Sequence, residues 1–186
     1  FRFVVRNSSL LSLASNLAFR ETNFSELVFQ NGNFDLITIK AFDGAIIDKL
    51  IIDGAESKSM SPFFKRSLLE RVPQVRYLKI SNVRDIFSVN SPIRKFVLDD
   101  LLLNPVLFSE LVELEILNTR VDYILSASLS LLPNLRVVRL ENVNLRAIIT
   151  HYFDEELPVI ADENQMVDFA DDRINWLSNR NLGRVY

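Results

Sequence analysis

The sequence contains no cysteine and a single histidine, His151, so it lacks the residues that most catalytic and metal-binding sites require. It has no thiolate nucleophile, no cysteine zinc site and no pair of histidines for a metal. Only 4 glycines occur, and none stands in a phosphate-binding arrangement. We therefore expect a protein that is not an enzyme and that holds no metal and no cofactor.

A basic excess and long apolar runs are also missing. The formal net charge is -3, which argues against nucleic acid as a partner. No run of about 20 apolar residues occurs, so we expect no membrane span. Hydrophobic residues make up 48% of the 186 residues, which is enough for one packed core. The length predicts a single domain over residues 1–186.

What the sequence does contain is an apolar triplet that recurs at first, fourth and sixth positions. Alignment of Phe19 with Phe42 superposes two copies displaced by about 23 residues. A strand this short cannot bury its apolar side alone, so successive coils must stack on one another. The fourth positions should therefore be buried and equivalent on successive parallel strands. These residues are Leu27, Leu50, Leu78, Phe96, Leu114, Val138 and Val167.

A second series of large apolar residues has nearly the same spacing. It predicts a buried aromatic stack on the returning side of each coil. The series consists of Phe19, Phe42, Phe64, Phe87, Phe108 and Phe153, with Leu131 in the one double step.

The triplet, followed in some copies by Asn82, Asn118 or Asn142, resembles the leucine-rich-repeat pattern L-x-x-L-x-L-x-x-N-x-L. The resemblance implies an α/β leucine-rich-repeat solenoid of about seven to eight irregular coils. Its parallel β-sheet would form the concave side, and short helices or turns would form the convex side. The ninth position rarely carries asparagine, so we expect the family's asparagine ladder to be mostly missing. The residues found there include Val83, Leu101, Thr119 and Val143.

Residues 37–44 resemble the I-x-x-x-A-F-x-G turn of extracellular leucine-rich repeats. This subtype implies a secreted or cell-surface protein, although the cysteine-rich caps of that subtype are absent, which leaves a cytoplasmic location as the alternative. The chain begins at Phe1, which predicts a processed product without its signal segment. Asn7 and Asn23 begin acceptor sequons and are candidates for glycosylation.

The spacing of the copies also predicts what joins them. The long interval before Val75 should contain a short helix over residues 62–71, and further convex helices are expected over 126–132 and 147–153. The copies that start at Val75, Ile93 and Leu111 are about 18 residues apart, which leaves room only for turns.

Third, fifth and seventh positions of each copy should point away from the core onto the concave sheet face. There Tyr77 among basic residues predicts a protein-binding anchor for an acidic or mixed-charge partner. The alternative is a soluble face with alternating charges. The candidate partner-binding residues are Arg76, Tyr77, Lys79, Arg94, Lys95, Val97, Glu113 and Glu115.

We expect a non-enzymatic leucine-rich-repeat binding scaffold that recognises a protein through this face. Two alternatives remain, a non-catalytic subunit that stabilises an enzyme partner and the repeat part of an intracellular adaptor. The terminal coils, at residues 1–5 and 167–174, lack recognisable caps and could pair with flanking repeats or another subunit.

Overall fold

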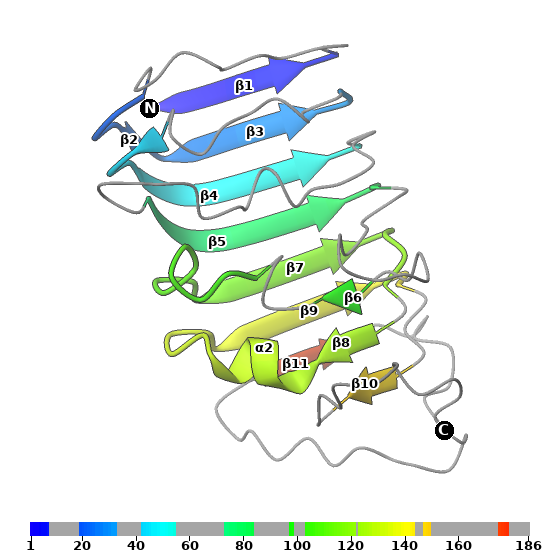
Figure 1. Cartoon of the computed structure of the whole chain (residues 1–186). Coiled ribbons are helices and arrows are strands. Elements are labelled where there is room, and N and C mark those ends of the chain that lie inside the picture. The colour runs from blue at the N-terminus through cyan, green and yellow to red at the C-terminus, as the bar shows by residue number, and fades with distance from the viewer. Residues whose placement is uncertain are drawn as a thin grey trace.

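The computed structural model describes nine parts of the chain: residues 1–7, 19–32, 42–54, 73–83, 97–98, 103–121, 123–143, 147–149 and 175–178. In these parts the strands stack side by side along one long axis (Figure 1). The large sheet has eight strands, all paired in parallel, in the order β1-β3-β4-β5-β7-β9-β11, with β2 paired to β4. The strands are β1 (Arg2–Arg6), β2 (Asn23–Phe24), β3 (Glu26–Gln30), β4 (Ile46–Asp53), β5 (Gln74–Ser81), β7 (Glu113–Leu117), β9 (Val137–Glu141) and β11 (Asn175–Ser178).

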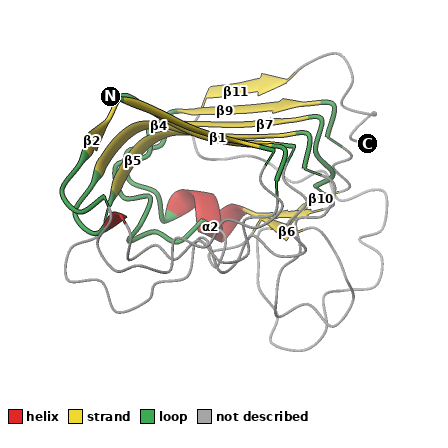
Figure 2. Ribbon diagram, turned by 90° about the horizontal axis from the view of Figure 1, so that it is seen from above, coloured by secondary structure: helices red, strands yellow, loops and turns green. Residues whose placement is uncertain are grey.

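A second, smaller sheet lies across the core from the large one (Figure 2). It consists of three parallel strands in the order β10-β8-β6, namely β10 (Ala147–Ile149), β8 (Tyr123–Leu125) and β6 (Val97–Leu98). The described part contains one α-helix, α2 (Ser126–Ser130), directly after β8. The structure is therefore a parallel β-solenoid with little helix, and the predicted solenoid is confirmed at that level.

The predicted equivalence of the fourth positions is confirmed for five residues. Leu27 pairs with Leu50, Leu50 with Leu78, Leu78 with Leu114, and Leu114 with Val138. All five side chains are buried in the core. Burial of this row removes apolar surface from water in every coil, so the row holds the coils together.

The copy predicted around Ile93 and Phe96 is wrong. β5 pairs directly with β7, so no strand from residues 93–98 lies between them. Val97 and Leu98 instead form β6 and pair with Tyr123 and Ile124 of β8 in the second sheet. One coil therefore runs from Val75 to Leu111. Apolar spacing reports that a side chain is buried but not which sheet buries it, and Leu98 is buried from the opposite side.

The residue predicted for the fourth position of the last coil is also wrong. The position beside Val138 is occupied by Trp176 of β11. Val167, predicted to fill that position, lies outside the part of the chain that the structure describes.

The connecting segments match the predictions in part. The helical turn expected over 126–132 is confirmed by α2. The helix expected over 147–153 is wrong at its start, because Ala147–Ile149 is strand β10 and pairs with β8. The helix expected over 62–71 lies outside the described residues.

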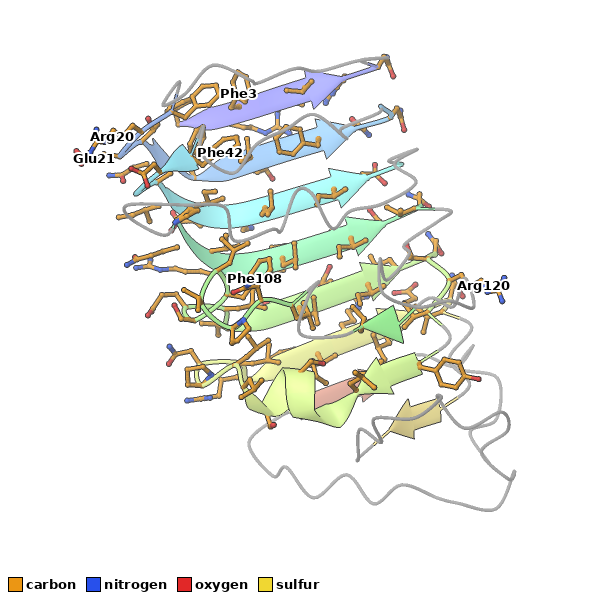
Figure 3. The ribbon with its side chains drawn as sticks, in the orientation of Figure 1. Phe3, Arg20, Glu21, Phe42, Phe108 and Arg120 are labelled. Carbon is orange, nitrogen blue, oxygen red and sulfur yellow. The ribbon has the colours of Figure 1, made fainter. Side chains whose placement is uncertain are left out.

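The aromatic series is confirmed at Phe42 and Phe108, which are buried, and the rings of Phe19 and Phe42 stack with centroids 5.4 Å apart (Figure 3). The prediction that Leu131 is buried is wrong, because Leu131 is 52% exposed, whereas its neighbour Leu132 is buried. The backbone explains the difference. The carbonyl of Leu132 accepts the amide of Leu135, as the carbonyl of Phe108 accepts that of Leu111, so these two residues are equivalent. The remaining members, Phe64, Phe87 and Phe153, lie outside the described residues.

The chain leaves β1, β3, β4, β5, β7 and β9 through a residue with a positive φ angle. These residues, which we call the left-handed column, are Asn7, Asn31, Gly54, Asn82, Asn118 and Asn142, with φ between 49° and 63°. Asparagine and glycine adopt this conformation most readily. Each column amide from Asn7 to Asn118 donates to the carbonyl of the last strand residue in the next coil, at 2.8 to 3.1 Å.

The column also carries the asparagine ladder that the sequence led us to expect to be mostly missing. The Nδ2 of Asn142 donates to Oδ1 of Asn118 at 2.8 Å, and the Nδ2 of Asn118 donates to Oδ1 of Asn82 at 3.2 Å. The ladder occupies the eighth position rather than the ninth, so that expectation is wrong. The ninth position points inward instead, where Val83, Thr119 and Val143 are buried.

The A-F-x-G segment contains a tight turn. The amide of Ala45 donates to the carbonyl of Phe42 at 2.9 Å, and Gly44 has a φ of 66°, a conformation that glycine reaches at no steric cost. The preceding coil repeats this turn, because the amide of Thr22 donates to the carbonyl of Phe19.

Candidate protein-binding face

The side chains at third, fifth and seventh positions of the large sheet point away from the core and form what we call the open sheet face. Strands β4, β5, β7 and β9 bring these positions into register across neighbouring coils. Tyr77 lies beside Glu113, and Lys79 lies beside Glu115. These four of the predicted partner-binding residues therefore form one contiguous group on two adjacent strands.

The other predicted residues do not join this group in the same way. Arg76 is exposed where β5 begins, and its Nη1 lies 3.4 Å from Oδ1 of Asp48. The prediction that Val97 lies on this face is wrong, because β6 belongs to the second sheet. Arg94 and Lys95 lie outside the described residues. Among the described residues, the basic side chains nearest Tyr77 along the sheet belong to β4 and β5.

Two side chains that the sequence argument did not place beside this group belong to it. The Nζ of Lys49 lies 5.7 Å from the centroid of the Tyr77 ring, and Nη1 of Arg139 lies 3.4 Å from Oε1 of Glu115. The supposed strand over residues 94–99 had separated β5 from β7. The interval from Val75 to Leu111 is long enough for a single coil that includes a strand of the second sheet. Its length could have indicated that β5 and β7 are adjacent.

The charges on the face neutralise one another in a row across β5, β7 and β9. Oε2 of Glu115 lies 3.8 Å from Nζ of Lys79, and Oε1 of Glu115 lies 3.4 Å from Nη1 of Arg139. Nη2 of Arg139 also forms an ion pair with Oε2 of Glu141 at 3.1 Å. The Glu115 side chain is only 10% exposed, so removal of its cationic partners would leave a poorly solvated carboxylate. The face is therefore a mixed-charge surface and not a basic patch.

Tyr77 is held by this network. Partial burial raises the pKa of its phenol, and a hydrogen bond to Glu115 and the charges of Glu115 and Glu113 raise it further, against the opposing effect of Arg139. Tyr77 is thus a neutral phenol throughout the physiological range. Its ring lies between Lys49 on one side and the Glu113 position on the other.

The face changes character toward the N-terminal coils. Its central row there is apolar and consists of Val4, Val28 and Ile51, which are paired in register across β1, β3 and β4. Val28 is 7% exposed, and Val4 and Ile51 are half-buried. The same row continues as Lys79, Glu115 and Arg139, so it changes from apolar to charged between Ile51 and Lys79. Lys49 and Tyr77 lie in the adjacent row, beside this change.

Asp53 lies at the C-terminal end of β4, at the edge of the open sheet face from which the chain leaves the strands. Its Oδ1 accepts Ser81 Oγ at 2.9 Å and Asn82 Nδ2 at 2.6 Å, and its Oδ2 accepts Gln30 Nε2 at 3.0 Å. Burial by itself would raise the pKa of Asp53, but the hydrogen bonds from Asn82, Ser81 and Gln30, together with the charge of Lys79, lower it overall. The carboxylate thus links β3, β4 and β5 to the left-handed column.

The Asp53 carboxylate should make stability depend on pH. Because its pKa is lower in the folded chain than the ordinary value of 3.8, its stabilisation is complete above that value and is lost as the pH falls through the folded pKa. We expect Asp53→Asn to lower the free energy of unfolding at neutral pH and to approach the parent below about pH 3. Denaturant unfolding between pH 2.5 and about 7 measures this.

Asp48→Asn is the matched control, because Asp48 is exposed and pairs only with Arg76 among the described contacts. It should change the free energy of unfolding by less than about 1 kcal/mol at any pH. A difference between Asp53→Asn and the parent that stays constant down to the lowest pH would contradict the role given to Asp53.

Candidate groups for other chemistry are few. Within the described ranges no cluster of His, Asp and Glu side chains could hold a metal ion, and no helix is long and apolar enough to cross a membrane. The glycosylation candidates Asn7 and Asn23 are both exposed. Comparison of the chain with protein-family models, curated proteins and solved structures finds no match.

Proposed function

We propose that this chain is a leucine-rich-repeat scaffold, without enzymatic activity, that binds another protein through the open sheet face around Tyr77. Support for the repeat family comes from the in-register apolar rows, the turn at residues 42–45 and the asparagine ladder in the left-handed column. The turn also favours a secreted or cell-surface setting, and the exposure of Asn7 and Asn23 is compatible with glycosylation there.

The observation that carries the proposed site is the setting of Tyr77. It is a half-buried aromatic side chain on a central strand, fixed by Lys49 and Glu115 and paired in register with Lys49 and Glu113. An aromatic residue held in one position loses little conformational freedom on binding, and such residues dominate the energetics of protein interfaces. Because Lys79, Glu115 and Arg139 are already paired with one another, the partner should present an apolar centre with a mixed-charge rim.

Site-specific photo-cross-linking tests the location. A photoreactive phenylalanine analogue at position 77 should capture a protein from an extract of the source organism, and unlabelled parent chain should compete with that capture. The control places the same analogue at Tyr123, on β8 of the second sheet. Equal capture of the same protein from both positions, or competition by Tyr77→Ala as strong as by the parent, would overturn the site.

With the captured partner purified, Tyr77→Ala should weaken binding by about 1 to 3 kcal/mol, or roughly 5-fold to 150-fold in Kd. Tyr123→Ala should leave Kd unchanged. Circular dichroism and thermal unfolding of both variants check that each remains folded, so that a loss of binding reports on the surface. An unchanged Kd for Tyr77→Ala in a folded protein would contradict the proposal.

A further inference from the structure

No described strand pairs with the outer edge of β1. On the inner side, the amide of Asn7 donates to the carbonyl of Gln30 and the carbonyl of Phe1 accepts the amide of Ser25, both at 2.9 Å. Backbone groups of a strand alternate in direction, so odd-numbered residues of β1 face β3. The amides and carbonyls of Arg2, Val4 and Arg6 therefore face outward, and no described strand pairs with them.

The core rows are also incompletely covered at this end. Phe3 and Val5 stand in the same rows as Leu27 and Phe29, yet only Leu27 and Phe29 are fully buried. Phe1 is 59% exposed although its ring contacts Phe24 at a centroid distance of 4.7 Å. Figure 3 shows Phe3 on β1, at one end of the row of stacked strands. In a solenoid such rows are normally completed by the next coil.

The opposite end of the same sheet has the complementary edge. All strands described in the sheet are parallel and in register, so the outer side of β11, at the other end of the described order, has the polarity that the outer side of β1 requires. The rows also correspond, because Trp176 continues the row of Phe3, and Asn175 continues the row of Arg2 without placing a like charge opposite it. Each copy of the chain thus carries both halves of a junction that the solenoid already uses between its own coils.

We propose that a second copy of this chain adds its β11 to the outer edge of β1, in parallel and in the same register. The contact is head to tail, because the two edges belong to opposite ends of the molecule. Such a contact does not close on itself, so assembly continues to trimers and longer species as the concentration rises. This interface is at the edge of β1, away from the group around Tyr77 on β5, and it does not depend on the proposed function.

Sedimentation velocity of the full chain over a range of concentrations tests the proposal. The parent should form species larger than the monomer, and their share should increase with concentration. Val4→Pro removes an outward amide of β1 without removing a hydrogen bond to β3, a position that proline tolerates at a free edge, and it should abolish the larger species. Val4→Thr keeps the amide and should assemble as the parent does.

Mixing gives a second readout that depends on the head-to-tail geometry. Val4→Pro retains its β11 edge and can still add to the β1 edge of the parent, where it ends growth, so excess variant should shorten parent assemblies. Should Val4→Pro fail to fold by circular dichroism, Phe1→Asp, which places a charge at the exposed end, is expected to reduce assembly in its place. A parent that stays monomeric at every concentration, or a folded Val4→Pro that assembles like the parent, would overturn the proposal.

Discussion

Phe108→Ala is expected to lower the free energy of unfolding by about 3 to 5 kcal/mol, the largest effect of any single change proposed for this chain. Phe108 is fully buried in the core cluster and lies in the turn that precedes β7. The turn that presents it has its own hydrogen bonds, since Asn104 Oδ1 accepts the amides of Val106 and Leu107. Alanine would keep this turn and leave a cavity, so the loss of stability would measure what the packing of the Phe108 ring contributes.

Denaturant unfolding with a parallel thermal scan measures the effect. Leu131→Ala is the control, because Leu131 occupies the position that the aromatic spacing had assigned to the core but is 52% exposed. It should change the free energy of unfolding by no more than about 0.5 kcal/mol. Similar losses for Phe108→Ala and Leu131→Ala would show that the two positions are not distinguished as the structure has them.

Gly54→Val is expected to cost about 2 to 4 kcal/mol. Two causes combine at this position of the left-handed column. Gly54 has a φ of 63°, which β-branched residues reach only with strain, and a Cβ atom there would collide with Oδ1 of Asn31. The backbone therefore favours glycine, and a larger residue would in addition displace the side chain of Asn31 in the preceding coil.

Asn7→Val separates these two causes. Asn7 has nearly the same backbone conformation, with a φ of 51°, but stands at the end of the column. Its replacement should cost about 1 to 2 kcal/mol from the backbone alone. The difference between the two variants, measured by denaturant unfolding, gives the contribution of the contact with Asn31. Equal costs would contradict the steric role of Gly54.

The sequence predicted the internal rows well because burial has a strong and local signature. Leu27, Leu50 and Leu78 are the fourth positions of successive apolar triplets, and the spacing within each triplet is that of a short strand with one buried side. The structure pairs the three residues in register. The turn at Gly44 was predicted from its resemblance to the A-F-x-G turn, and glycine there accommodates the positive φ.

The sequence could not assign buried residues to one sheet or the other. Leu98 and Leu114 are both buried, yet they belong to opposite sides of the core, and their spacing in the chain does not distinguish these sides. That error carried into the candidate site, because it inserted Val97 between Lys79 and Glu115, which are in fact neighbours. The asparagine ladder was missed for a related reason. The strand exits one residue earlier than the repeat pattern implies, so Asn118 turns outward and Thr119 inward.

Paired cysteines test the central structural claim, that one coil runs from Val75 to Leu111 and passes through the second sheet. The chain has no cysteine of its own, so two engineered thiols report a single proximity. The structure pairs Val97 with Tyr123 across β6 and β8 and separates it from Lys79 on β5. With a short thiol-specific cross-linker, the Val97→Cys/Tyr123→Cys chain should be bridged within the folded monomer, and the Val97→Cys/Lys79→Cys chain should not. Bridging of Val97 to Lys79 without bridging to Tyr123 would contradict the account.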